Sequence, residues 1–152
     1  EYSMSSQLNV DTIVDKAGTS GPSLPNTTTI KMGNTSTYVS DGGAVTQNTV
    51  QSLVKCWVQF DGTAGGGASA RDSFNVASLT DHSEGRTGIN FTNNMSNDDF
   101  SAPVGAQDTS TRTNVHTSFE AQSTSMVEII HFESGGALDC NRVGVIVAGD
   151  LA

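Results

Sequence analysis

Acidic and histidine side chains that could bind a metal ion occur together in one short stretch, Asp81-His82-Ser83-Glu84. Histidine nitrogens and carboxylates are zinc ligands, and carboxylate oxygens also bind calcium. All four residues lie within one turn, and no second group of ligands follows at the spacing of a zinc or calcium site. A polar hairpin turn therefore explains this stretch better than a metal site.

The other candidate motifs also lack the pattern that their chemistry needs. Asn97-Asp98-Asp99 does not have the alternating order of a calcium loop, and the glycine-rich GTAGGGAS has neither the lysine nor the following helix of a phosphate loop. No nucleophile motif of the G-x-S-x-G type occurs. The sequence predicts a protein that is not an enzyme and has no cofactor or metal.

Two histidines and two cysteines lie in strand-like segments. His116 alternates with Val115 and Thr117, so we expect it to face solvent or a neighbouring chain. His131 is either a buried core histidine or an interface residue. Cys56 and Cys140 lie in apolar contexts where a free thiol packs as a small hydrophobic group, although the sequence does not fix their redox state.

Composition limits the classes of partner. The 152 residues carry a formal net charge of -9 and no cluster of lysine and arginine, which argues against nucleic-acid binding. No apolar run approaches the roughly 20 residues that span a bilayer, so we expect no membrane insertion. The N-terminus also lacks the basic and apolar regions of a signal peptide.

The order of strand and turn signals predicts an all-β protein. Short alternating segments separated by turn residues predict an antiparallel β-sandwich, jelly-roll-like in topology, over residues 50–152. Residues 1–49 are poor in large apolar side chains and are expected to form an extended N-terminal arm for attachment, with the candidate contact residues Leu8, Val10, Ile13 and Val14. Within the sandwich we expect strands near 50–60, 72–79, 87–92, 112–120, 125–132 and 142–149.

Several strands are apolar on both faces. Trp57 lies opposite the core-facing Cys56 and Val58, and two further segments, MVEIIHF (126–132) and GVIVA (144–148), have no polar face. A small sandwich normally exposes one face of each strand to water, so we expect the arm or another subunit to cover the second face. The candidate oligomer interface is Trp57, Ile129, His131 and Ile146.

Three blocks of sequence occur in order at close spacing: VKCWVQFDGT (54–63), RDSFNVASLTD (71–81) and GINFTNNMSNDDF (88–100). Together they resemble a domain of structural proteins in tailed bacteriophages, notably marine ones, that form tail fibres or similar appendages. The segment LNVDTIVDKAGTSGPSLPN (8–26) resembles one found in phage tail and fibre proteins. Ile89, Phe100 and the glycine-rich loop 62–70 depart from the family pattern, without breaking the expected strands.

The resemblance implies a location in the virion and a structural role, and it carries no catalytic residues. The expected partners are further copies of the chain, most simply in a homotrimer, other virion proteins of the tail or capsid, and a glycan of the host surface. Two alternatives remain open at this point, a capsid-decorating fibre or knob and a carbohydrate-binding module.

Overall fold

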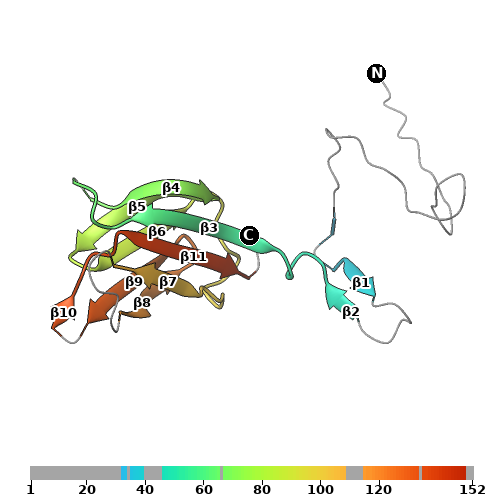
Figure 1. Cartoon of the computed structure of the whole chain (residues 1–152). Coiled ribbons are helices and arrows are strands. Elements are labelled where there is room, and N and C mark those ends of the chain that lie inside the picture. Colours follow the sequence, from blue (N-terminus) through green and yellow to red (C-terminus); the bar gives the residue numbers. More distant parts are fainter. Residues whose placement is uncertain are drawn as a thin grey trace, which may run out of the picture. The chain divides into compact units, whose positions relative to one another are not determined.

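The computed structural model describes residues 32–33, 35–39, 46–65, 67–108, 115–133 and 135–149. The chain divides into two units, Glu1–Met32 and Gly33–Ala152, and nearly all described residues belong to the second. The described part of this unit contains strands and no helix, as expected (Figure 1). The arm residues Leu8, Val10, Ile13 and Val14 lie outside the described residues.

The strands follow one another with short connections, and their bounds agree with most of the expected segments. In chain order they are β1 Thr37–Val39, β2 Thr46–Asn48, β3 Val54–Asp61, β4 Ser69–Phe74, β5 Val76–Ser83, β6 Arg86–Phe91, β7 Val104–Gln107, β8 His116–Ser123, β9 Met126–Glu133, β10 Gly136–Ala137 and β11 Arg142–Ala148.

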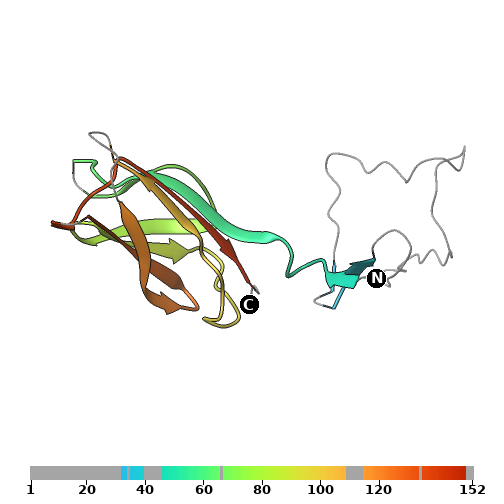
Figure 2. The same cartoon turned by 60° about the horizontal axis from the view of Figure 1, so that its bottom comes forward.

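Nine of these strands form two antiparallel sheets that pack as a sandwich, and the order in the first sheet is β4-β3-β11-β7. In the second sheet β6 lies between β5 and β9, while β8 and the short β10 also pair with β9 (Figures 1 and 2). Strands β1 and β2 form a separate two-stranded ladder, in which Thr37 pairs with Asn48. The antiparallel β-sandwich predicted from sequence is therefore confirmed.

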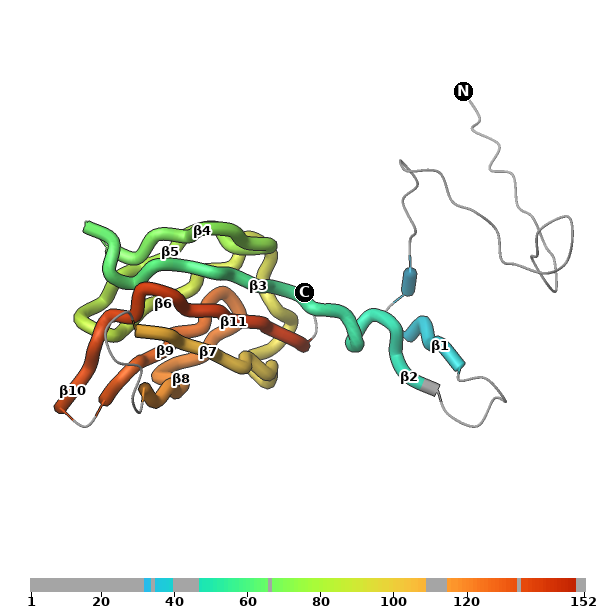
Figure 3. Tube along the Cα trace, viewed as in Figure 1, coloured from blue at the N-terminus to red at the C-terminus, as the bar shows by residue number. Residues whose placement is uncertain are grey.

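The jelly-roll topology is not confirmed by this strand order. The first and last strands of the sandwich, β3 and β11, are neighbours. Three pairs of successive strands, β3–β4, β5–β6 and β8–β9, are hydrogen-bonded neighbours within one sheet. The path of the chain through these pairs can be followed in Figure 3. The predicted boundary between residues 49 and 50 falls between β2 and β3.

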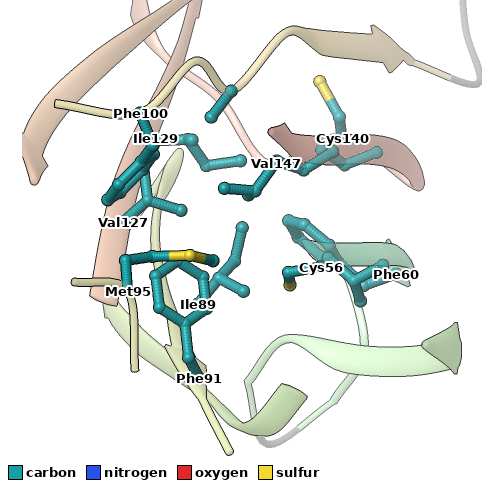
Figure 4. Close-up of a cluster of buried hydrophobic side chains, with 14 residues drawn as sticks. Cys56, Phe60, Ile89, Phe91, Met95, Phe100, Val127, Ile129, Cys140 and Val147 are labelled. Atoms are coloured by element: carbon teal, nitrogen blue, oxygen red, sulfur yellow. The ribbon is translucent and has the colours of Figure 1, made fainter. Parts of the chain in front are cut away.

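A core of buried apolar side chains fills the space between the two sheets. Alternation along β3 and β11 directs every second residue inward, and the facing strands β6 and β9 supply Ile89 and Ile129, both fully buried (Figure 4). The rings of Phe91 and Phe100 meet edge to face, with centroids 5.7 Å apart. The other members of the core are Cys56, Val58, Phe60, Met95, Ala102, Val127, Cys140, Val143, Val145 and Val147.

Asn75 connects the two sheets between β4 and β5. Its φ of 59° is left-handed, a conformation that asparagine tolerates better than most residues. Its side chain donates to the carbonyl oxygen of Lys55 at 3.0 Å and accepts from the amide of Asn93 at 2.7 Å. The single strand expected over 72–79 is therefore wrong, because Asn75 divides this segment into two strands of different sheets.

Candidate functional site

The outer face of the first sheet carries a row of apolar side chains that no described residue covers completely. Trp57 on β3 is the register partner of Phe74 on β4 and of Ile146 on β11. The amide of Ile146 donates to the carbonyl oxygen of Pro103, which continues the row toward β7. Directly paired residues of a sheet share a face, so Phe74, Trp57, Ile146 and Pro103 form what we call the outer row.

Exposure along the outer row is high for such large side chains. Phe74 is 53% exposed and Ile146 is 47% exposed, while Trp57 between them is half-buried. The inward neighbours of these residues, such as Val58 and Val145, are buried in the core. The core is thus complete without the outer row, and the row is available to a partner.

Next to the outer row the sheet surface is hollowed. A space of about 450 Å³ lies against Trp57, Pro103 and Ile146, and its lining includes Gly105 and Gly144. A second space of about 320 Å³ shares these two glycines. Its polar lining consists of Gln59, Gln107 and Arg142. We call the two spaces together the outer groove.

The four residues predicted at an oligomer interface do not lie together. Trp57 and Ile146 are paired on the outer face, but Ile129 is fully buried and His131 is 2% exposed. Both are enclosed by their own sandwich, so the prediction that they contact another subunit is wrong. The outward side of β9 instead carries Ile130 and Phe132, of which Phe132 is 39% exposed.

His131 occupies an unusual environment for a histidine. Within the described part of the chain, neither of its ring nitrogens has a hydrogen-bond partner. Burial lowers the pKa of His131, and the nearby carboxylate of Asp139 opposes this shift in part. The neutral imidazole is therefore favoured in the folded protein. Of the two alternatives that the sequence allowed, a core histidine and an interface residue, this environment fits the core histidine.

The polar turns hold structural hydrogen bonds. The amide of Asp99 donates to the side chain of Asn97 at 2.9 Å, a typical turn contact. Hydrogen bonds from the hydroxyl and amide of Thr63, followed by the charge of Arg71, hold the pKa of Asp61 below its usual value. No group of three potential metal ligands exists among the described residues.

Both cysteines are buried free thiols. Burial raises the pKa of Cys56 to about 11, and burial together with the charges of Asp108 and Asp139 raises the pKa of Cys140 to about 11. Thiolates are the reactive form of cysteine, so both groups act as packing residues at neutral pH.

Sequence reasoning missed most of the outer groove. Phe74, Gln59 and Arg142 were not selected, because each lies in a strand where an outward polar or aromatic residue is ordinary. The signal that could have found the site was a glycine inside each of two apolar strand segments, Gly105 and Gly144. They are register partners, and this pairing cannot be read from the sequence.

No family model, no curated protein and no solved structure matches this chain. The described part contains no helical segment with the length and apolar character that a bilayer crossing would need.

Proposed function

We propose that this chain is a structural protein of a bacteriophage virion, a component of a tail fibre or similar appendage that acts by binding rather than by catalysis. The three phage-like blocks support this role, as does the antiparallel sandwich. The observation that carries the proposal is the outer row, because a sandwich with a complete core still presents large apolar side chains on one sheet face. The proposal assigns no catalytic residue and no cofactor.

The sandwich provides a rigid platform for contact. Complete burial of a large apolar side chain that was fully exposed contributes about 1.5 to 3 kcal/mol to the free energy of binding. The side chains of the outer row are already partly buried in the free protein, so each contributes less than this. Phe74, Trp57 and Ile146 of the row lie on regular strands, so little conformational entropy is lost when a partner binds. The chain is proposed to reach the host surface through this face, and to attach to the particle through residues 1–49.

Self-association is a second part of the proposal, and the described surface offers a separate place for it. Strand β8 pairs with β9 along one edge, and its other edge has no strand partner among the described residues. Phe119 of β8 is 44% exposed, and Phe132 stacks on His116 with ring centroids 5.4 Å apart. Unpaired backbone groups and exposed aromatic rings favour pairing with another copy. We therefore propose β8 as the homotrimer contact, which leaves Trp57 and Ile146 for another partner.

Localisation on particles tests the main proposal. Antibodies raised against the purified chain, bound to intact phage and imaged by electron microscopy, are expected to mark the tail or its fibres. Label on the capsid would instead favour the capsid-decorating fibre or knob. A chain that is absent from purified particles would overturn the virion assignment.

Light scattering after size-exclusion chromatography tests self-association. A trimer is expected at about three times the 15.8 kDa of one chain. Phe132→Ser is expected to lower this mass, whereas Phe74→Ser, at an exposed position of the other sheet, is the matched control and should leave it unchanged. A wild-type monomer, or an equal loss of mass in both variants, would contradict the contact at β8.

A further inference from the structure

The outer groove exists because two strands lack side chains at the same place. Gly105 on β7 and Gly144 on β11 are register partners, and a Cβ atom added to either would meet nothing within 4 Å. Neither glycine is therefore required by crowding, and neither has the positive φ that favours glycine. Glycine inside a strand weakens the sheet and often marks a site where a ligand approaches the backbone.

The polar end of the outer groove has unused hydrogen-bonding capacity. Within the described residues, the side chains of Gln59, Gln107 and Arg142 make no hydrogen bond or ion pair. The other described cations are all engaged: Lys55 donates to the carbonyl oxygen of Val50, Arg71 pairs with Asp61, and Arg86 pairs with two glutamates. Among the residues that the structure describes, Arg142 is thus the arginine without an ion pair, on a chain whose formal net charge is -9.

The groove combines an apolar wall with polar groups that both donate and accept. Trp57 and Ile146 line one end, and Arg142 lies four residues from Ile146 along β11. At about 3.3 Å per strand residue, the two ends are about 13 Å apart. A matching ligand has a flat apolar surface at one end, hydroxyl or carboxylate groups at the other, and a length greater than one small ring.

We propose that the outer groove binds an oligosaccharide. The C–H face of one sugar ring packs against the indole of Trp57, and hydroxyl groups exchange hydrogen bonds with the amides of Gln59 and Gln107, which can donate and accept. Arg142 binds a hydroxyl or carboxylate of a further sugar. This inference rests on the proposed host contact and names the class of ligand at that surface.

A second copy of this chain is the competing occupant, and the polar groups of the groove disfavour it. A flat contact would bury Gln59, Gln107 and Arg142, which costs free energy unless each finds a partner. A hydroxyl-rich ligand satisfies these groups directly.

The single tryptophan of the chain makes the site directly measurable. A glycan array probed with the labelled full-length chain selects ligands, and glucose, N-acetylglucosamine and galacturonic acid trimers are titrated while Trp57 fluorescence is followed. A saturable change with at least one array hit or trimer is expected. Comparison of the acidic with the neutral sugars identifies what Arg142 binds.

Gly144→Val is the decisive variant, because a Cβ atom added at Gly144 would meet nothing within 4 Å, so the new side chain can occupy the groove while Trp57 remains as reporter. It is expected to weaken binding about tenfold or more, equivalent to at least about 1.4 kcal/mol. Arg142→Gln should weaken binding of acidic sugars more than of neutral ones if a carboxylate binds there, and Trp57→Ala should remove binding measured by calorimetry. Leu53→Ala, which removes an exposed apolar side chain outside the outer row, the outer groove and the β8 contact, is the matched control.

Three results would overturn the oligosaccharide site. These are no saturable response to any sugar, binding that Gly144→Val leaves unchanged, and a fall in oligomer mass in Gly144→Val, which would identify the groove as a self-contact. Particle localisation is independent of these outcomes. If the chain binds sugar but is absent from virions, the oligosaccharide site stands and the virion role is rejected. If the chain is present in virions but binds no sugar, the virion role stands and the oligosaccharide site is rejected.

Discussion

The carbonyl oxygen of His131 lies 2.6 Å from the position that a Cβ atom would occupy on Gly85. The two residues are also joined by a hydrogen bond, in which the amide of His131 donates to the carbonyl oxygen of Gly85 at 2.8 Å. Gly85 has a φ of +72°, and its own amide donates to the carboxylate of Asp139 at 2.7 Å. The turn after β5 is therefore fastened to the strand that carries the buried histidine.

Gly85→Ala is expected to lower the free energy of unfolding by about 2 to 4 kcal/mol, because a side chain adds left-handed strain and a clash with backbone atoms. Gly136→Ala is the matched control, since Gly136 has a φ of +136° but open space around its Cα atom. Urea denaturation measures both. Equal losses in the two variants would show that strain alone, without the clash, sets the cost at Gly85.

Acidification is expected to destabilise the fold through His131. Its folded-state pKa lies below the unfolded value of 6.5, so between these two values the unfolded chain binds more protons. Stability from this group is fully present above pH 6.5 and is lost as the pH falls toward the folded pKa. Urea denaturation of wild type and His131→Leu between pH 8 and pH 5 measures the effect. The variant should lose less stability on acidification, and parallel curves would contradict a buried neutral imidazole.

Both thiols are expected to resist modification in the folded protein. With pKa values raised to about 11, Cys56 and Cys140 hold little thiolate at pH 8, and both side chains are buried. An aromatic disulfide reagent should react slowly with the native chain and rapidly in denaturant, where both thiols become accessible. Cys140→Ala would then release half as much chromophore in denaturant. Fast reaction of the native protein would show that one cysteine is exposed.

Truncation of a core aromatic ring is expected to be costly. Phe60 is fully buried, and Phe60→Ala should lower the free energy of unfolding by about 3 to 5 kcal/mol through lost burial and the cavity that remains. Phe74→Ala removes the same atoms from a side chain that is 53% exposed, so its cost should be much smaller. Thermal and urea unfolding compare the two. Similar losses would indicate that Phe74 is covered in the native assembly.

The sequence was sufficient to predict the strands whose two faces differ. In β3, buried Cys56, Val58 and Phe60 alternate with outward residues, and the period of two identifies both the strand and its inner face. In β9 the contrast is absent, since Val127 and Ile129 alternate with Met126 and Ile130. Which side of such a strand is buried depends on how the second sheet packs against it, so Ile129 was assigned to the wrong surface.

The candidate site was predicted in part for a related reason. Trp57 and Ile146 stood out because each is a large apolar residue opposite a core-facing neighbour. The outer groove depends on the pairing of β7 with β11, and β7 was not predicted at all, because its sequence, VGAQ, is short and contains little β-branched or aromatic character. Long-range register is a property of the whole fold and is not encoded in any local pattern.

The connection between the two sheets at Asn75 is one residue long, which limits where insertions can be accepted. Extra residues between Phe74 and Val76 would move the end of β4 away from the start of β5 and disturb the packing of both sheets. Residues 62–68 instead connect β3 to β4, which are neighbours in the same sheet. Extra residues in this connection can extend into solvent without separating the two strands. Insertions that create new surface loops are therefore expected to be tolerated in the connection 62–68 and not at Asn75.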